Sequence, residues 1–148
     1  MRYRAESSMD HSPAPVHVDA RLRVIYGDTD QMGVVYYANY LRYFEFSRSE
    51  YFRARGGNYV ELERTGFGLP VVEAHCEYRA PARYDELLVI RVHVAQLKRA
   101  SIRFEYQVLR DAEGPLLATG YTLHACVGRD GRPTRLPADV VKLLSSPP

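Results

Sequence analysis

The chain has 148 residues, of which 46% are hydrophobic and 26% are charged, and its formal net charge is +2. This length and composition are typical of one globular domain. The arginines are scattered among acidic residues, and the sequence contains no zinc-finger spacing, RNA-binding signature or long basic helix, so a nucleic-acid partner is not expected. No apolar stretch approaches the roughly 18 residues of a membrane span, so membrane insertion is not expected either.

The first 18 residues mix charge, Ser and Pro without periodicity, which predicts a disordered N-terminal tail before a single domain over residues 19–148. This tail lacks the apolar core of a signal peptide. Cys76 and Cys126 stand far apart, without the paired spacing of a zinc site, which favours two reduced thiols. Together these features favour the cytoplasm.

The first predicted elements are a strand over residues 20–26 and a long helix over residues 37–55, separated by the turn-forming sequence GDTDQMG. The helix is closed by Gly56 and Gly57. A shorter helical piece, Tyr59–Arg64, is expected to follow. Residues at spacings of three and four predict the buried face of the long helix, namely Tyr40, Tyr43, Phe44, Ser47, Tyr51 and Ala54.

Beyond Gly68, alternation of apolar and polar residues predicts four strands, at 69–80, 87–97, 101–109 and 115–127. Short connections make the later strands antiparallel neighbours. Pro137 is well placed to start a closing helical turn.

This order of elements predicts an α+β fold, with a five-stranded antiparallel sheet and one long helix against a single face. Such a sheet cannot bury both of its faces alone. We therefore expect a dimer with paired edge strands, or a tetramer of stacked dimers, and composition does not decide between them.

Two carboxylates, Asp28 and Asp30, lie in the loop before the long helix, and Gly33 follows them. The first turn of a helix leaves backbone N–H groups unpaired and carries partial positive charge. In one interpretation both aspartates only shape the loop. In the other, one of them attacks a carbonyl or activates a water, while the helix N–H groups stabilise the oxyanion. Spacing alone does not choose.

The sequence YGDTDQMGVVYYANYLRYFE, residues 26–45, resembles the signature of the 4-hydroxybenzoyl-CoA thioesterase family and of its Tol-Pal-associated acyl-CoA thioesterase branch. The resemblance continues more loosely through the strand pattern and the segment YRAPARYDE, and covers residues 21–127. It implies a hot-dog fold, in which the sheet wraps around the long helix. It also implies hydrolysis of an acyl-CoA to acid and CoA by a dimer or tetramer.

The resemblance assigns roles within the loop. The family's catalytic carboxylate lies three residues before the glycine of the motif, which makes Asp30 the nucleophile or general base. Its oxyanion donor is a backbone N–H four residues after that glycine, here Tyr37. Many relatives carry His at this position, so the Tyr removes a possible acid–base side chain. Gly33 and Val34 are expected to contact substrate, and Asp28 is interpreted as structural.

A further carboxylate, Glu45, lies eight residues beyond Tyr37 on the predicted helix. A related clade of hot-dog thioesterases uses a helix carboxylate at about this place. The alternative, a surface ion pair with Arg42 or Arg48, is weighed equally.

The best local cluster of donors for the CoA phosphates is Lys98, Arg99 and Ser101, at the turn between two predicted strands. In relatives, the cations that bind these phosphates come from strand ends and a loop near the subunit boundary. A solvated hairpin tip is the alternative interpretation of these three residues.

The sequence gives no sign of a metal or cofactor. Its five histidines form no metal spacing and no triad motif, namely His11, His17, His75, His93 and His124. There is no P-loop or dinucleotide-binding glycine pattern, so neither ATP nor NAD is implied.

There are two alternatives to the thioesterase function. A hot-dog dehydratase acting on hydroxyacyl thioesters resembles a different motif, with a loop His that is absent here. A non-catalytic protein that binds acyl thioesters is the second alternative, and the presence of Asp30 and Gly33 favours the enzyme. The class of the acyl group, aromatic, short or long, does not follow from the sequence.

Overall fold

The structure, a computed structural model, describes residues 16–145. Five strands form one antiparallel sheet in the order β1-β3-β4-β5-β2. The strands are β1 (His17–Arg23), β2 (Val71–Tyr78), β3 (Leu87–Leu97), β4 (Ser101–Arg110) and β5 (Leu116–Ala125). The helices are α1 (Asn39–Ala54), α2 (Tyr59–Arg64) and α3 (Ala138–Ser145), with a 3₁₀ turn η1 (Tyr26–Asp28) before α1.

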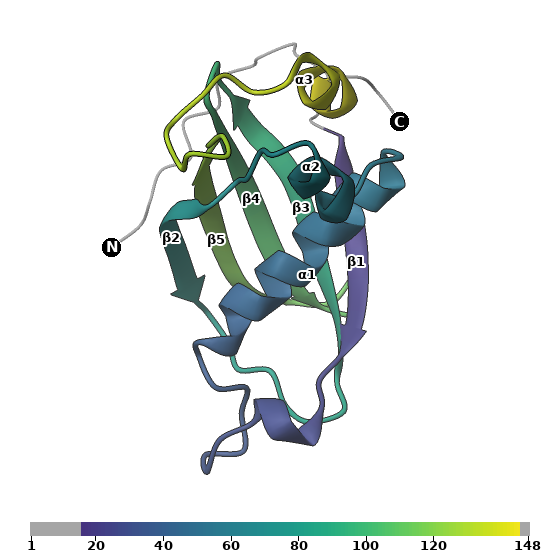
Figure 1. The fold of residues 1–148 in the computed structure, drawn as a ribbon. Helices are drawn as coiled ribbons and strands as arrows, with labels where there is room; N and C mark the ends of the chain where they lie inside the picture. Colours follow the sequence, from purple (N-terminus) through teal and green to yellow (C-terminus); the bar gives the residue numbers. More distant parts are fainter. Residues whose placement is uncertain (1–15, 146–148) are drawn as a thin grey trace, which may run out of the picture.

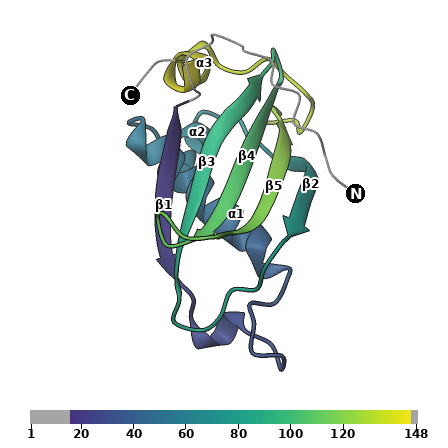
Figure 2. The same cartoon turned by 180° about the vertical axis from the view of Figure 1, so that it is seen from behind.

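The long helix α1 lies across one face of the sheet (Figure 1). From behind, no helix of residues 16–145 covers the opposite face (Figure 2). The predicted five-stranded antiparallel sheet is confirmed. None of the helices in the described part of the chain is long and apolar enough to cross a membrane.

The first strand lies three residues earlier than predicted. Strand β1 begins at His17 and ends at Arg23, because the next residues turn. The N–H of Asp28 donates to the Ile25 carbonyl at 3.1 Å, which closes η1 and ends the extended chain. Strand β1 therefore begins two residues before the predicted start of the domain at residue 19. Residues 1–15 of the predicted tail lie outside the described residues.

The helix α1 also starts later than predicted, at Asn39. The N–H of Tyr36 donates to the Asp28 carbonyl at 2.9 Å and not to a helical acceptor, so the chain enters the helix through a turn. Five of the six predicted buried residues of α1 are buried, but Ala54 is exposed. Phe52 is buried although it was not predicted, because the Tyr59 ring of α2 folds back onto it at 4.5 Å.

The core lies between α1 and the inner face of the sheet. Phe44 of α1 stacks on Tyr106 of β4 with ring centroids 4.2 Å apart. Gly120 of β5 permits this approach, because a Cβ there would lie 2.6 Å from the Phe44 ring. The remaining core is formed mainly by alternate residues of β3 and β4, namely Leu88, Ile90, Val92, Ile102, Phe104 and Val108.

A row of buried polar groups crosses this core. Arg48 Nη1 donates to the Tyr106 hydroxyl at 3.2 Å, and that hydroxyl lies 2.6 Å from Thr122 Oγ1. Thr122 Oγ1 in turn lies 2.8 Å from His124 Nε2, while His124 Nδ1 lies 2.9 Å from the Leu69 carbonyl. His124 falls in a predicted strand, with an acid–base role left open if it entered a cleft, and the structure shows that it is buried in this row.

We expect His124 to make the free energy of unfolding depend on pH. Burial, with a contribution from the charge of Arg48, lowers the pKa of His124 from 6.5 to about 4. The unfolded chain therefore takes up the proton first. The destabilisation that His124 causes is absent above about pH 6.5 and grows as the pH falls toward 4. It reaches at most about 3 kcal/mol. Urea unfolding of the wild type and His124→Gln at pH 7.5 and 4.5 measures it.

The wild type should lose more stability between these two pH values than His124→Gln, whose amide keeps donor and acceptor groups but does not titrate. Carboxylates also titrate in this range, so the difference between the two proteins is the quantity to compare. An equal loss in both would show that His124 is not responsible.

Candidate functional site

The loop between η1 and α1 folds into a tight hairpin that carries Asp30. The Asp30 N–H donates to the Val34 carbonyl at 3.0 Å, and the Gly33 N–H donates to the Asp30 carbonyl at 2.9 Å. Thr29 and Val35 close the hairpin as an antiparallel bridge. Gly33 has a φ of 75°, in the left-handed region that glycine adopts without strain. The hairpin therefore has a defined shape before any ligand binds.

The side chain of Asp30 is half-buried and only partly engaged. Its Oδ1 accepts the N–H of Met32 at 2.9 Å, and its Oδ2 has no hydrogen-bond partner within residues 16–145. The pKa of the Tyr36 phenol is raised, first by its hydrogen bond with the Tyr37 phenol and more weakly by the charge of Asp30. The charge of Asp30 thus acts on a residue of the segment that leads into α1.

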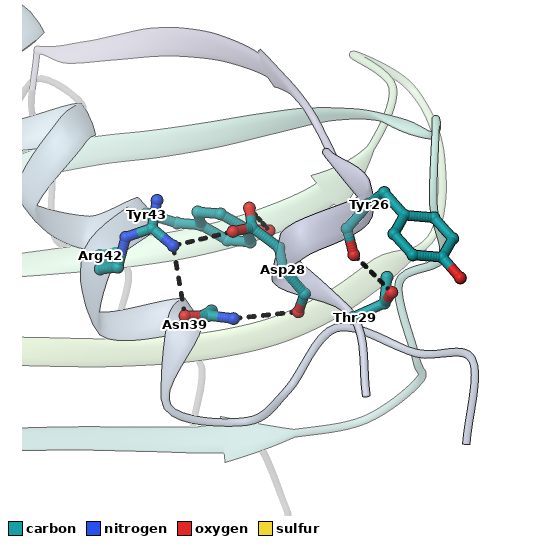
Figure 3. A network of polar contacts seen from close by, with 6 residues as sticks. All are labelled: Tyr26, Asp28, Thr29, Asn39, Arg42 and Tyr43. Carbon is teal, nitrogen blue, oxygen red and sulfur yellow. Dashed lines mark hydrogen bonds and ion pairs between the residues drawn. The ribbon is translucent and has the colours of Figure 1, made fainter. Parts of the chain in front are cut away.

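Asp28, by contrast, is buried and points at α1 (Figure 3). Its Oδ1 accepts from Arg42 Nη1 at 2.8 Å, and its Oδ2 accepts from the Tyr43 hydroxyl at 2.9 Å. Its backbone carbonyl accepts from Asn39 Nδ2 at 2.9 Å. Burial and the Asp28 carboxylate raise the pKa of the Tyr43 phenol, which keeps it protonated as a donor.

These contacts fasten the loop to the first turns of α1, which agrees with the structural role assigned to Asp28. The partners of Asp28 were not among the predicted site residues. Arg42 and Tyr43 lie three and four residues after Asn39 along the helix, and this shared face was the available signal.

The N-terminus of α1 is uncapped. Ala38, the residue before the helix, has no side-chain cap, and the first turn contains no acidic residue. The N–H groups of Tyr37 and Ala38 donate to no acceptor within residues 16–145. Tyr37 is 62% exposed, so this turn lies at the surface of the chain. Because unpaired N–H groups at a helix start attract negative charge, this end of α1 is suited to an oxyanion.

One further residue, Tyr78 at the end of β2, contacts this helix start, and the sequence analysis missed it. Its hydroxyl donates to the Tyr37 carbonyl at 2.9 Å. Its ring meets the Tyr40 ring edge-on, with centroids 5.0 Å apart. No local pattern could have found this contact, because it depends on how β2 lies beside α1.

Glu45 lies apart from the Asp30 hairpin. It is exposed and lines a pocket of about 390 Å³ between β1 and α1, whose lining includes Asp28 and Arg42 but not Asp30 or Tyr37. Neither expected ion pair of Glu45 forms within residues 16–145. Arg42 binds Asp28 instead, and Arg48 donates to the Tyr106 hydroxyl. The structure therefore does not bring Glu45 together with the two other predicted catalytic residues.

The turn that carries Lys98, Arg99 and Ser101 lies at the opposite end of the sheet from η1 (Figure 1). Strand β3 starts beside the loop, where the Val24 N–H donates to the Glu86 carbonyl, and runs away from it to Leu97. At about 3.3 Å per residue this strand spans roughly 33 Å. Within one chain, these three residues are therefore far from Asp30.

This chain is similar to known proteins in both sequence and structure. The sequence profile of the thioesterase-like superfamily matches residues 24–144. The acyl-CoA thioester hydrolase YbgC of Escherichia coli O6:H1 is 33% identical over 121 residues, which cover 81% of this chain and 90% of that protein.

Two solved structures are similar over most of their length. A hypothetical protein from Thermus thermophilus has a TM-score of 0.82 and 39% identity, covering 86% of this chain and 96% of that chain. DHNA-CoA thioesterase from Staphylococcus aureus has a TM-score of 0.83 and 28% identity, covering 87% of this chain and 89% of that chain. The chain belongs to the thioesterase-like superfamily, as its motif over residues 26–45 indicated.

Proposed function

We propose that this chain hydrolyses the thioester of an acyl-CoA to a free acid and CoA, within a hot-dog fold whose sheet wraps around α1. The observation that carries the proposal is a carboxylate oxygen of Asp30, free of protein partners within residues 16–145, in the short loop that leads into the uncapped start of α1. The Escherichia coli relative is named an acyl-CoA thioester hydrolase and the Staphylococcus aureus structure a DHNA-CoA thioesterase, which supports the thioester as the bond that is cleaved.

In the proposed reaction, Asp30 either attacks the thioester carbonyl or removes a proton from a water that attacks it. Both routes need the same carboxylate in nearly the same place. Negative charge then develops on the carbonyl oxygen, where the N–H of Tyr37 and the helix dipole stabilise it. CoA leaves as a thiolate, and because a thiol pKa of about 8.5 is far below that of an alcohol, no strong general acid is required. If water attacks, the acid is released directly. If Asp30 attacks, the acyl group stays on its carboxylate as a mixed anhydride, and a water hydrolyses this anhydride to release the acid and restore Asp30.

We also propose that the chain acts as a homodimer joined through β2, alone or stacked into a tetramer. Strand β2 pairs with β5 on one side, and its other edge has no partner within residues 16–145. Apolar side chains stay exposed along it, including Val71 at 47%, Val72 at 59% and Tyr78 at 48%. A long apolar edge strand is prone to aggregation unless another chain covers it, which favours pairing with a second copy.

The proposed dimer would give the turn between β3 and β4 a role in binding substrate. Since Lys98, Arg99 and Ser101 lie far from Asp30 of their own chain, they would bind the CoA phosphates at the site of a second copy. Glu45 would join the reaction only through substrate that reaches its separate pocket.

We assign the protein to the cytoplasm, where the free thiols of Cys76 and Cys126 would stay reduced.

The test is thiol release from a panel of aromatic, short-chain and long-chain acyl-CoAs, with an oxygen ester of the preferred acyl group as the matched comparison. We expect turnover of at least one thioester and much slower turnover of the ester, since an alkoxide is the poorer leaving group. Saturable binding without release of thiol would favour a non-catalytic thioester-binding protein. Neither binding nor release across the panel would overturn the proposal.

A further inference from the structure

We propose that Tyr78 is a positioning residue of the oxyanion site, which orients and polarises the peptide between Tyr37 and Ala38 and makes the Ala38 N–H a second oxyanion donor. The inference rests on the proposed function. It assigns a role to a side chain from β2, outside the loop and helix that carry the motif.

The contact acts on a rigid unit. The carbonyl of Tyr37 and the N–H of Ala38 belong to one planar trans peptide, so they point in opposite directions. The Tyr78 hydroxyl donates to this carbonyl at 2.9 Å, whereas the helical N–H of Tyr40 reaches it only at 3.3 Å. The direction of the Ala38 N–H is therefore set mainly from β2.

The two peptides at the helix start are held in different ways. The Tyr36 carbonyl, in the same peptide as the Tyr37 N–H, accepts from Asn39 at 2.9 Å within the entry turn. The Tyr37 carbonyl accepts from the Tyr78 hydroxyl at 2.9 Å, which is shorter than its 3.3 Å contact with the Tyr40 N–H. A hydrogen bond to a carbonyl also strengthens the N–H of the same peptide as a donor, since linked hydrogen bonds polarise one another.

Tyr78 is itself held in place by rings. Its ring lies edge-on to the Tyr40 ring at 5.0 Å and to the Tyr37 ring at 6.5 Å. Burial raises the pKa of its phenol, so the hydroxyl remains a donor at neutral pH. Replacement by Phe would keep the ring and its aromatic contacts and remove only the hydroxyl.

The experiment compares Tyr78→Phe with Tyr84→Phe on the best substrate of the panel. Tyr84 is a matched control because it is exposed and contacts the Tyr26 ring, and its hydroxyl has no hydrogen bond within residues 16–145. We expect Tyr78→Phe to lower kcat by about three- to tenfold with KM within about twofold, because the oxyanion forms only in the transition state. Tyr84→Phe should match the wild type in both.

A second readout does not need activity. Hydrogen exchange at the Ala38 amide, followed by NMR in the same proteins, should be slower in Tyr78→Phe, because this N–H has no acceptor to protect it and loses the polarisation that makes it more acidic, and unchanged in Tyr84→Phe. Wild-type kcat and unchanged exchange in Tyr78→Phe would overturn the inference while the proposed function stands, and so would an effect on KM alone. If the wild type cleaves no thioester the proposed function fails, and unchanged exchange would then refute the positioning role separately.

Discussion

Asp30→Asn is expected to lower kcat by about a hundredfold or more on whichever acyl-CoA the chain hydrolyses, the scale expected for removal of a central catalytic group. The amide has the size of the carboxylate and keeps an oxygen to accept the Met32 N–H, so the hairpin should retain its shape. It can neither attack a carbonyl nor remove a proton from water. Thiol release at saturating substrate measures kcat, and urea unfolding should show nearly unchanged stability.

Asp130→Asn is the matched control for this change. Asp130 Oδ1 accepts the N–H of Arg132 at 3.0 Å, the same two-residue contact that Asp30 makes with Met32. It lies in the loop after β5, beyond the residues that form the site. Loss of activity in Asp30→Asn but not in Asp130→Asn would assign the effect to chemistry and not to turn geometry. If Asp30→Asn is fully active, the Asp30 mechanism is wrong, and Glu45→Gln becomes the next variant to measure.

The sheet could be predicted from the sequence because each strand carries a local signal. In β4 the buried residues alternate strictly with less buried ones, as a half-buried strand requires. The shift of β1 shows where this signal fails. Residues 24–26 are apolar and β-branched or aromatic, which favours a strand, yet the hydrogen bond from Asp28 to Ile25 bends the chain there.

The site could be predicted only in part, for a similar reason. Asp30 and Tyr37 lie within one continuous motif, in the segment that leads into the uncapped helix start. Tyr78 and the exposed edge of β2 belong to a strand that reaches the site only through tertiary packing. The turn at Lys98 was linked to the site by chemistry alone, and the length of β3 separates the two in one chain.

Loss of the buried Asp28 carboxylate, which anchors the loop to α1, is expected to have a large effect on stability. Asp28→Ala should lower the free energy of unfolding by roughly 3 to 4 kcal/mol, because it removes two hydrogen bonds to a buried carboxylate and leaves the Tyr43 hydroxyl without its acceptor. Arg42 is largely exposed and can turn to water, so no buried cation is left behind. Urea unfolding at neutral pH measures the change.

Glu50→Ala supplies the comparison that isolates burial. Glu50 and Arg53 form an ion pair at 2.7 Å, almost the same distance as the 2.8 Å between Asp28 and Arg42, but both partners are solvent-exposed. Water and mobile side chains weaken such a pair, so its loss should cost less than about 1 kcal/mol. Similar costs for the two variants would contradict the anchoring role. A large cost for Asp28→Ala alone would mean that the loop carrying Asp30 is held to the first turns of α1 mainly by this buried carboxylate.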